Sequence, residues 1–297
     1  MRVIVTGREG QVARALAAAS HRFGATAICL GRPDLDLERP EQATAILIAA
    51  RPDVIVNAAA YTAVDKAELE PDKARAINTE GAAAAARAAQ SAGVPIIQIS
   101  TDYVFDGTLD RPYQENDATG PLGVYGRTKL DGENAVRAIT PSHVILRTAW
   151  VYSTFGNNFV RTMLRLALTR DEIGVVADQH GCPTSADDIA VAILKLARQL
   201  TDHSAEPSFP WGIYHMAAQG DAVWADVADA VFARSKALGG PCAEVRRIET
   251  SAYPTPAKRP ANSRLDSGKL AGLGIELPNW RSSLDACVKA LLPGGRV

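Results

Sequence analysis

Short apolar runs alternate with longer segments of helical periodicity along the first half of the chain. The runs are rich in Val and Ile and almost continuous, which is typical of strands buried on both faces of a parallel sheet. Strands are predicted at residues 2–7, 25–31, 53–60, 94–100 and 143–152. Helices are predicted at residues 11–24, 38–52 and 78–93. The alternation predicts an α/β fold: a doubly wound parallel (Rossmann) sheet covered by helices on both faces.

The second half of the chain has a different texture. Pro, Gly and aromatic residues are dense in QHGCPTS (179–185), EPSFPWGIYH (206–215) and SAYPTPAKRPANSRLD (251–266). Two helices are predicted there, at residues 185–200 with Ser185 as N-cap and at 223–240. We therefore expect a dinucleotide-binding domain at residues 1–150 and, at 151–297, mainly a smaller α/β substrate lobe. The helix at 185–200 is expected to return to the first domain.

The composition excludes several classes of partner. The chain has 297 residues, 47% of them hydrophobic and 22% charged, and a net charge of −1. This balance offers no basic surface for nucleic acid or an anionic membrane. No apolar run approaches the ~20 residues of a membrane-spanning helix, and the opening MRVIVTG lacks a secretory core, so we expect a cytoplasmic protein. The four cysteines and five histidines are scattered, which predicts free thiols and no metal site built from them.

A glycine-containing turn follows the first predicted strand in VTGREGQVARAL. Gly7 and Gly10 allow a tight turn and a close approach of a pyrophosphate, and the helix that follows offers free N–H groups to the anion. Ala13 stands where many such loops have a third glycine. The position of the pair between a strand and a helix favours a dinucleotide site over a glycine-rich turn without a ligand.

The choice of dinucleotide depends on the residues after the second strand, CLGRPDLDL. An acidic side chain there suits the ribose diol of NADH, whereas an arginine suits the 2′-phosphate of NADPH. Gly31 and Arg32 occupy this position, and Asp34 and Asp36 follow. Arg32 favours NADPH, although it is also an ordinary surface charge, so NADH stays open.

Two further strand ends carry candidate residues. Small residues in NAAAYTAVDKAE (57–68) leave room for a cofactor over the third strand, or simply pack closely. In ISTDYVFDG (99–107), Ser100 and Thr101 place hydroxyls where a substrate carbonyl could be bound; the alternative is that they cap the next turn together with Asp102.

The stretch VYGRTKLDGE places Tyr125 four residues before Lys129. This spacing brings the two side chains to one helix face, about one turn apart. A nearby ammonium favours the ionised form of a phenol, so the pair predicts a tuned proton donor. Taken alone, the pair is better explained as an ordinary solvated helix start, because this spacing occurs by chance in many helices.

The order of these features resembles the extended, nucleotide-sugar branch of the short-chain dehydrogenase/reductase superfamily. Longer strings are similar to the dTDP-4-dehydrorhamnose reductase family. The strings are RPDVIVNAAAYTAVDKAE, STDYVFDG, YGRTKLDGE, LRTAWVY, GNNFVRTMLRLA and YPTPAKRPANSRLD, and they span residues 51–266. The last string is the most discriminating, because general epimerases and dehydratases of the branch lack it.

The resemblance implies NAD(P)H-dependent reduction of the C4 ketone of dTDP-6-deoxy-L-lyxo-4-hexulose to dTDP-β-L-rhamnose, the last step of dTDP-rhamnose biosynthesis. It implies that Tyr125 gives a proton to the forming alkoxide. Lys129 would lower the pKa of Tyr125 and bind the nicotinamide ribose, and Thr101 would hydrogen-bond the carbonyl oxygen.

The resemblance also implies the residues that contact the two ligands. For the cofactor they are Gly10, Gln11 and Val12 at the pyrophosphate, Asp36 and Leu37 near the adenine, and Ala60, Tyr61 and Thr62 along its middle, together with Tyr125 and Lys129. Gly7, from the glycine turn, and Arg32, from the end of the second strand, complete the expected cofactor set. For the dTDP-sugar they are Thr101, Asp102, Trp150, Arg259 and Asn262. Trp150 is equally a candidate core aromatic, and Lys258 and Arg264 are equally candidate surface charges.

Several points stay open at this level. Some members of the family are Mg²⁺-bridged homodimers, but the sequence identifies no acidic set for such a bridge. Another nucleotide-sugar modifier such as a 4-epimerase is an alternative enzyme. A non-catalytic protein like the regulatory β subunit of methionine adenosyltransferase, which resembles the same family, is an alternative of another class.

Overall fold

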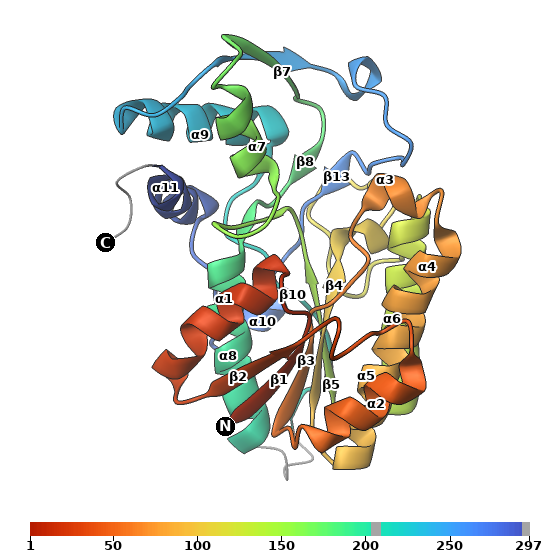
Figure 1. Ribbon diagram of the computed structural model, residues 1–297. Helices are drawn as coiled ribbons and strands as arrows, with labels where there is room; N and C mark the ends of the chain where they lie inside the picture. Colours follow the sequence, from red (N-terminus) through yellow and green to blue (C-terminus); the bar gives the residue numbers. More distant parts are fainter. Residues whose placement is uncertain (203–208, 293–297) are drawn as a thin grey trace.

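A six-stranded parallel sheet forms the centre of the computed structural model, which describes residues 1–202 and 209–292 (Figure 1). The strand order is β10-β5-β4-β3-β1-β2, and every neighbouring pair is parallel. The strands span Arg2–Thr6 (β1), Thr26–Leu30 (β2), Val54–Asn57 (β3), Ile96–Thr101 (β4), His143–Thr148 (β5) and Gly212–His215 (β10). The chain changes direction across the sheet at β1, so a crevice is expected beyond the carboxyl ends of β1 and β3.

Helices cover both faces of this sheet, which confirms the doubly wound fold (Figure 1). One face carries α1 (Gln11–Ala19), which continues into the 3₁₀ turn η1 (Ser20–Phe23), and α8 (Ala186–Asp202). The other face carries α2 (Pro40–Ala49), α5 (Gly81–Ala92) and α6 (Val124–Ile139). Short helices α3 (Val64–Ala67) and α4 (Pro71–Arg75) and a π-helical turn η2 (Ala76–Glu80) connect β3 to α5.

The remaining elements form a smaller layer beyond the carboxyl edge of the sheet (Figure 1). Its strands are β6 (Val151–Tyr152), β7 (Glu172–Val176), β8 (His180–Gly181), β9 (Thr184–Ser185), β11 (Ala222–Val223), β12 (Glu244–Ile248) and β13 (Asn262–Ser263). Its helices are α7 (Phe159–Leu166), α9 (Trp224–Ala237) and α11 (Trp280–Leu291). The other short elements of the chain are η3 (Asp102–Val104), η4 (Thr250–Ala252) and α10 (Gly268–Ala271).

The second half of the chain contributes to both layers. Helix α8 packs on α1, and the backbone N–H of Asp187 donates to Ser185 Oγ at 3.2 Å, so the predicted N-cap is confirmed. Strand β10 pairs with β5 at the sheet edge, with His215 opposite Arg147. Residues 212–215 therefore belong to the central sheet, although they lie in the segment expected to form mainly the smaller lobe; residues 206–208 lie outside the described residues.

One predicted strand is broken by its backbone. Residues 143–152 form β5 and the short β6, because Trp150 has φ +49 and turns the chain out of the sheet. The turn directs the chain toward the smaller layer, where β6 pairs with β9.

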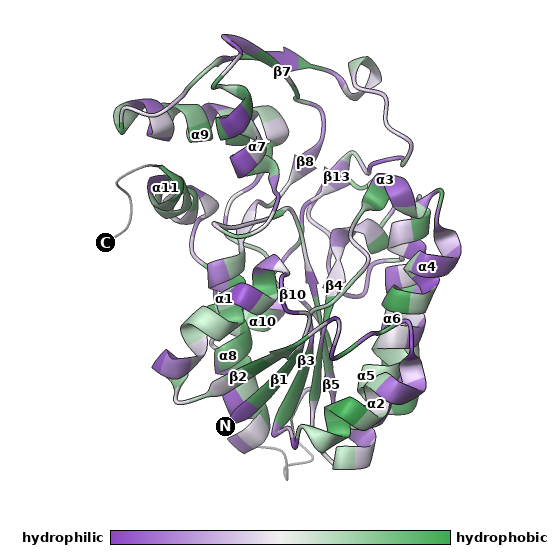
Figure 2. Cartoon of the chain, viewed as in Figure 1, coloured by the Kyte–Doolittle hydropathy of each residue, from purple (hydrophilic) through white to green (hydrophobic). Residues whose placement is uncertain are grey.

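Apolar residues follow the predicted pattern along the centre of the molecule. Figure 2 shows the strands of the central sheet in hydrophobic colour. The two cores on either side of the sheet contain fully buried residues of the same strands, such as Val3 and Val5 on one face and Ile4 on the other. This alternation explains why residues 3–5 of β1 are all apolar.

Candidate active site

The turn between β1 and α1 has the backbone that the glycine pair predicts. Gly7 has φ +95, a conformation that favours glycine, and its N–H donates to the carbonyl of Leu30 at 2.6 Å. Gly10 precedes α1 without a side-chain cap, and a Cβ at this position would meet no atom within 4 Å. The first turn of α1 therefore begins beside open space, with its N–H groups free for an anion.

A buried chain of hydrogen bonds holds together the strands below this turn. Thr6 Oγ1 donates to Asn57 Oδ1 at 2.5 Å, and Asn57 Nδ2 donates to Gln98 Oε1 at 2.7 Å. Thr6 Oγ1 also accepts from the backbone N–H of Ala59 at 3.0 Å. Because these side chains satisfy one another, the carboxyl ends of β1, β3 and β4 are fixed relative to the crevice.

Helix α6, which carries Tyr125 and Lys129, lies unusually close to its neighbours. A Cβ on Gly126 would lie 2.1 Å from the carbonyl oxygen of Tyr103, and one on Gly132 would lie 2.2 Å from that of Asn78. Only glycine permits both approaches. The segment YGRTKLDGE contains both glycines, but the local sequence does not predict which backbone segment each glycine contacts.

An acidic side chain distant in the sequence caps the same helix. Glu68 Oε1 accepts from the backbone N–H of Val124 at 2.8 Å, the first residue of α6. A carboxylate at this position is favourable because it faces the positive end of the helix dipole. Sequence reasoning missed Glu68, since its partner lies 56 positions away.

Thr101, Tyr125 and Lys129 come together at the carboxyl end of β4. The hydroxyl of Tyr125 is hydrogen-bonded to Thr101, and its ring packs edge-on against Tyr103 with ring centroids 5.5 Å apart. Burial raises the pKa of Tyr125 to about 12, although the bond to Thr101 opposes the shift. The phenol therefore holds its proton at neutral pH, as a proton donor must.

Lys129 is 4% exposed, and its Nζ donates to the carbonyl of Ile99 at 2.6 Å. Burial lowers its pKa to about 8, and the negative charge of Glu133 opposes this shift. The contact that the ammonium makes here is the hydrogen bond to the β4 backbone. The expected lowering of the Tyr125 pKa by Lys129 therefore stays a prediction.

Asp102 lies beside Thr101 and is almost fully buried. Thr101 Oγ1 donates to Asp102 Oδ1 at 3.0 Å, while Oδ2 has no hydrogen-bond partner among the described residues. Burial raises the pKa of Asp102 to about 6, and the hydroxyls of Ser263 and Thr101 lower it in part. An acceptor oxygen without a partner at this point is suited to a hydroxyl group of a ligand.

The other residues predicted to contact the cofactor are spread around the crevice. Gln11 Oε1 accepts from Ser153 Oγ and Asn158 Nδ2, both at 2.9 Å, so the side chain of Gln11 ties the first turn to the smaller layer. Val12 packs partly buried against the core on that face. Arg32 is an exposed side chain 3.8 Å from Glu38.

The segment after β3 is held by hydrogen bonds to later residues of the helical connection between β3 and α5. Tyr61 donates its backbone N–H to Asn78 Oδ1 at 2.8 Å and its hydroxyl to Glu70 Oε2 at 2.6 Å. Ala60 beside it is partly exposed and Thr62 is exposed. Asp36 Oδ1 accepts from the N–H of Glu38 at 3.1 Å, and the neighbouring Leu37 is buried.

Trp150 stands at the junction of the two layers. Its indole stacks on Trp224 with centroids 3.6 Å apart and planes 8° apart. A Cβ on Gly181 would lie 2.3 Å from the Trp150 ring, so the indole rests directly on that backbone. Trp150 is partly exposed, which separates it from a fully buried core aromatic.

Arg259 and Asn262, both from the C-terminal string, have partners within the chain. Arg259 pairs with Asp65 in α3, with 2.9 Å between Nη2 and Oδ2, and so links the two layers. Asn262 donates to the carbonyls of Leu109 and Arg111 at 2.8 and 2.7 Å, which uses both of its amide hydrogens. Asn262 thus fixes the loop after β4 rather than offering a free donor.

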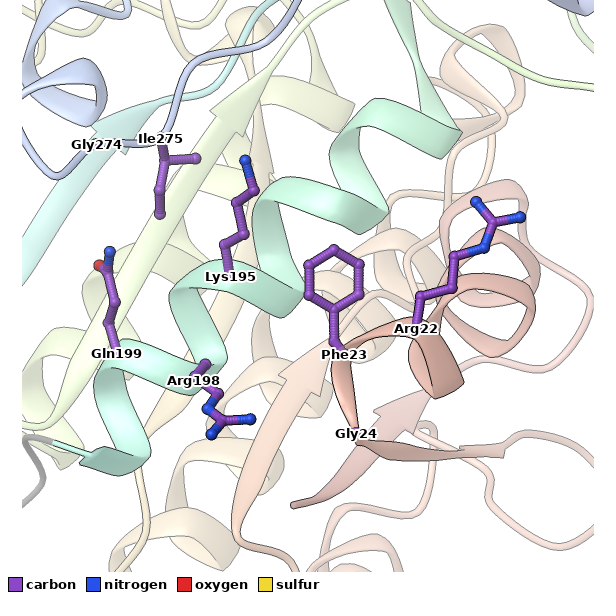
Figure 3. A pocket seen from close by; sticks show the side chains of 8 residues that line it. All are labelled: Arg22, Phe23, Gly24, Lys195, Arg198, Gln199, Gly274 and Ile275. Carbon is purple, nitrogen blue, oxygen red and sulfur yellow. The ribbon is translucent and has the colours of Figure 1, made fainter.

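A surface hollow of about 610 Å³ lies elsewhere, between η1, α8 and residues 274–275 (Figure 3). Its cationic side chains, Arg22, Lys195 and Arg198, point in different directions and do not converge (Figure 3). It contains none of the predicted site residues. No cluster of His, Cys, Asp or Glu suited to a metal ion occurs in residues 1–202 and 209–292, and no helix there is long and apolar enough to cross a membrane.

Comparison with known sequences identifies close relatives over the whole chain. The family model described as the RmlD substrate binding domain matches residues 1–292. The dTDP-4-dehydrorhamnose reductase of Sinorhizobium fredii is 51% identical over 297 residues, which cover 100% of this chain and 99% of that protein. The enzyme of the same name from Escherichia coli K12 is 42% identical over 290 residues, 95% of either chain.

Solved structures agree with the sequence relatives. A dTDP-4-dehydrorhamnose reductase from Clostridium acetobutylicum superimposes with a TM-score of 0.89 at 37% identity, over 98% of this chain and 99% of that one. The enzyme of that name from Bacillus anthracis, in complex with NADP, has a TM-score of 0.88 at 34% identity, over 96% and 98%. A Thermus thermophilus UDP-glucose 4-epimerase, at 20% identity and a TM-score of 0.78 over 98% and 99%, shares the fold.

Proposed function

The chain belongs to the family of dTDP-4-dehydrorhamnose reductases, and from this premise we propose how its residues reduce the C4 ketone of dTDP-6-deoxy-L-lyxo-4-hexulose to dTDP-β-L-rhamnose. Its activity is that of an NADPH-dependent oxidoreductase. The observation that carries the proposal is the gathering of Thr101, Tyr125 and Lys129 at the carboxyl end of β4, on the same edge of the sheet as the first turn of α1, which is open to an anion.

The residues of the first turn fit a dinucleotide. Gly10 leaves open space at the start of α1, so the backbone of Gly10, Gln11 and Val12 would hold the pyrophosphate. Arg32 is exposed beyond β2, where it would meet a 2′-phosphate at the cost of only a weak surface ion pair with Glu38. Ala60 and Tyr61 would line the middle of the cofactor. When bound, the reduced nicotinamide supplies the hydride to C4 of the sugar.

The chain's own residues manage the negative charge that grows on the ketone oxygen. The hydroxyl of Thr101 would turn from Asp102 Oδ1 to donate to that oxygen, and Tyr125 would transfer its proton to it. The pKa of Tyr125, raised to about 12 by burial, keeps this proton in place until the alkoxide forms. Lys129, one turn further along α6, provides a positive charge that stabilises the phenolate left behind. Acid catalysis of this kind contributes roughly 10²–10⁴ in rate.

The sugar nucleotide would lie between the two layers. Asp102 has a buried oxygen free to accept from a sugar hydroxyl, and Trp150 offers a partly exposed aromatic face. Arg259 would reach the diphosphate in exchange for its ion pair with Asp65. Asn262, whose amide is fully used, contributes by holding the loop at residues 109–111 in position.

The test is direct turnover. The purified protein is mixed with NADPH and the keto-sugar nucleotide, generated in situ, and the absorbance of the reduced nicotinamide is followed. We expect a loss of absorbance that depends on the keto-sugar, with a rhamnosyl nucleotide as product. A different product sugar would indicate another nucleotide-sugar enzyme. Cofactor binding without oxidation of NADPH or NADH would contradict the catalytic role and favour a binding protein.

A further inference from the structure

A buried ion pair lies directly behind the site on the inner face of α6. Glu133 follows Lys129 by one helical turn and is 1% exposed. Its carboxylate accepts from Arg147 through two bonds, at 3.0 Å from Nε and 2.7 Å from Nη2. The hydroxyl of Ser100 donates to the same carboxylate. Three hydrogen bonds from β4 and β5 thus fix Glu133 in one orientation.

The partners of Glu133 belong to the strands that carry the site. Ser100 precedes Thr101 on β4, and in the sheet register it stands opposite Arg147 on β5. Lys129 contacts β4 as well, at the carbonyl of Ile99. The ion pair therefore joins α6 to the two strands within one residue of Thr101.

The charges around Lys129 are few and buried. Glu133 is the charged side chain that raises the Lys129 pKa against the effect of burial. Arg147 stands beyond Glu133 and is 2% exposed. On β10, the pKa of His215 is lowered to about 3 by burial and by Arg147, so His215 is neutral at physiological pH. On the other side, Tyr125 holds its proton. The arrangement is cation, anion, cation in a nearly water-free interior.

Such an arrangement depends on its central anion. An arginine cannot lose its proton in a protein, whereas a buried lysine readily does. Without Glu133, the interior would hold two cations and no anion, and Lys129 is the one able to become neutral. The positive charge assigned to Lys129 under the proposed function would then be absent at neutral pH.

We propose that Glu133 is a positioning residue for the reduction: its fixed carboxylate keeps the ammonium of Lys129 charged beside Tyr125 and seats α6 against β4 and β5. This inference rests on the proposed function. Under this proposal, the effect of Glu133 on catalysis depends on the charge of Lys129. An ion pair with a purely structural role would have no such dependence.

The test is the pH profile of keto-sugar reduction by Glu133→Gln, with wild-type protein in parallel. Burial lowers the pKa of Lys129 to about 8, so we expect Lys129 to set the alkaline limb of kcat in the wild type. In Glu133→Gln this limb should move down by about one pH unit or more, since a close opposite charge shifts a pKa by ~1–3 units. The ratio of wild-type to variant kcat would then rise roughly tenfold between pH 6.5 and 8.5. The same ratio at both pH values would overturn the proposal.

Two further variants guard against trivial explanations. Ser100→Ala removes one hydrogen bond to Glu133 but no charge, so its alkaline limb should stay where the wild type has it. Glu133→Gln leaves Arg147 buried without its anion, which destabilises the fold; the double variant Glu133→Gln/Arg147→Met removes both charges and is better tolerated. We expect the double variant to melt cooperatively and to keep the shifted limb.

The outcomes separate the two proposals. An active wild-type protein whose folded variants show an unshifted limb overturns the role of Glu133 alone, as does a failure of both Glu133 variants to fold, which would make the ion pair structural. A wild-type protein that binds NADPH but reduces no keto-sugar at any pH overturns the proposed function, and this inference with it.

Discussion

Gly126→Ala should test whether the close approach of α6 to the loop after β4 positions the proton donor. The added Cβ would lie 2.1 Å from the Tyr103 carbonyl oxygen and 3.0 Å from Pro121 Cβ. Carbon and oxygen atoms ordinarily approach no closer than about 3.3 Å. Helix α6 and the loop must therefore separate by roughly 1 Å. This movement displaces Tyr125, which immediately precedes Gly126 in the helix. A misplacement of ~1 Å can cost about 10²-fold in rate.

The assay measures both consequences of this displacement. We expect kcat for keto-sugar reduction to fall about 10²-fold, and urea unfolding to show a loss of about 1–3 kcal/mol, the usual range for overpacking. Arg127→Ala is the matched control, because Arg127 is the next residue of the same helix and its side chain is exposed. A Gly126→Ala protein with wild-type kcat and wild-type stability would refute the reasoning.

Three further predictions concern single side chains. Tyr125→Phe should lower kcat by ~10²–10⁴ and leave NADPH affinity unchanged in a fluorescence titration; lost affinity with normal turnover would contradict its role. Trp224→Leu removes the stack under Trp150, worth about 0.5–1.5 kcal/mol, so the KM of the sugar nucleotide should rise roughly two- to tenfold with kcat retained. Burial raises the pKa of Asp102 to about 6, above its unfolded value near ~3.9, so wild-type protein should lose stability relative to Asp102→Asn as the pH rises from about 4 to 7, by on the order of 2 kcal/mol. Urea unfolding at both pH values checks this, and a difference that does not change with pH would contradict it.

Strands of the first half were predictable because burial on both faces leaves a continuous apolar run in each. Where another force dominates, the pattern fails. Strand β10 consists of only four residues between Pro, Gly and aromatic neighbours, and it exists because its backbone pairs with β5. The run 143–152 is mostly apolar, yet the positive φ of Trp150 ends the strand, and the indole of Trp150 stacks on Trp224 and lies against Gly181. Neither the pairing of β10 nor these contacts of Trp150 are local in the sequence.

The candidate site likewise has features that are local in the sequence, which could be predicted, and features that depend on distant residues, which could not. A helical spacing of four is a local property, so the shared face of Tyr125 and Lys129 could be predicted. The depth of Lys129 could not, because it depends on what covers α6. Glu133 meets an arginine 14 positions away, and the cap from Glu68 comes from 56 positions away.

The ion pair of Arg259 shows how contacts distant in the sequence affect ligand binding. By sequence it is a cation in a string that resembles a sugar-nucleotide site, but in the fold its charge is matched by Asp65, 194 positions away, and the guanidinium lowers the pKa of that carboxyl. A diphosphate would therefore compete with Asp65 for Arg259, and the affinity it would gain is the difference between the two pairings. Since Asp65 belongs to α3 and Arg259 to the smaller layer, the exchange would also release a contact between the layers. Binding and the relative position of the layers would thus be coupled through one side chain, although its letter in the sequence indicates only a positive charge.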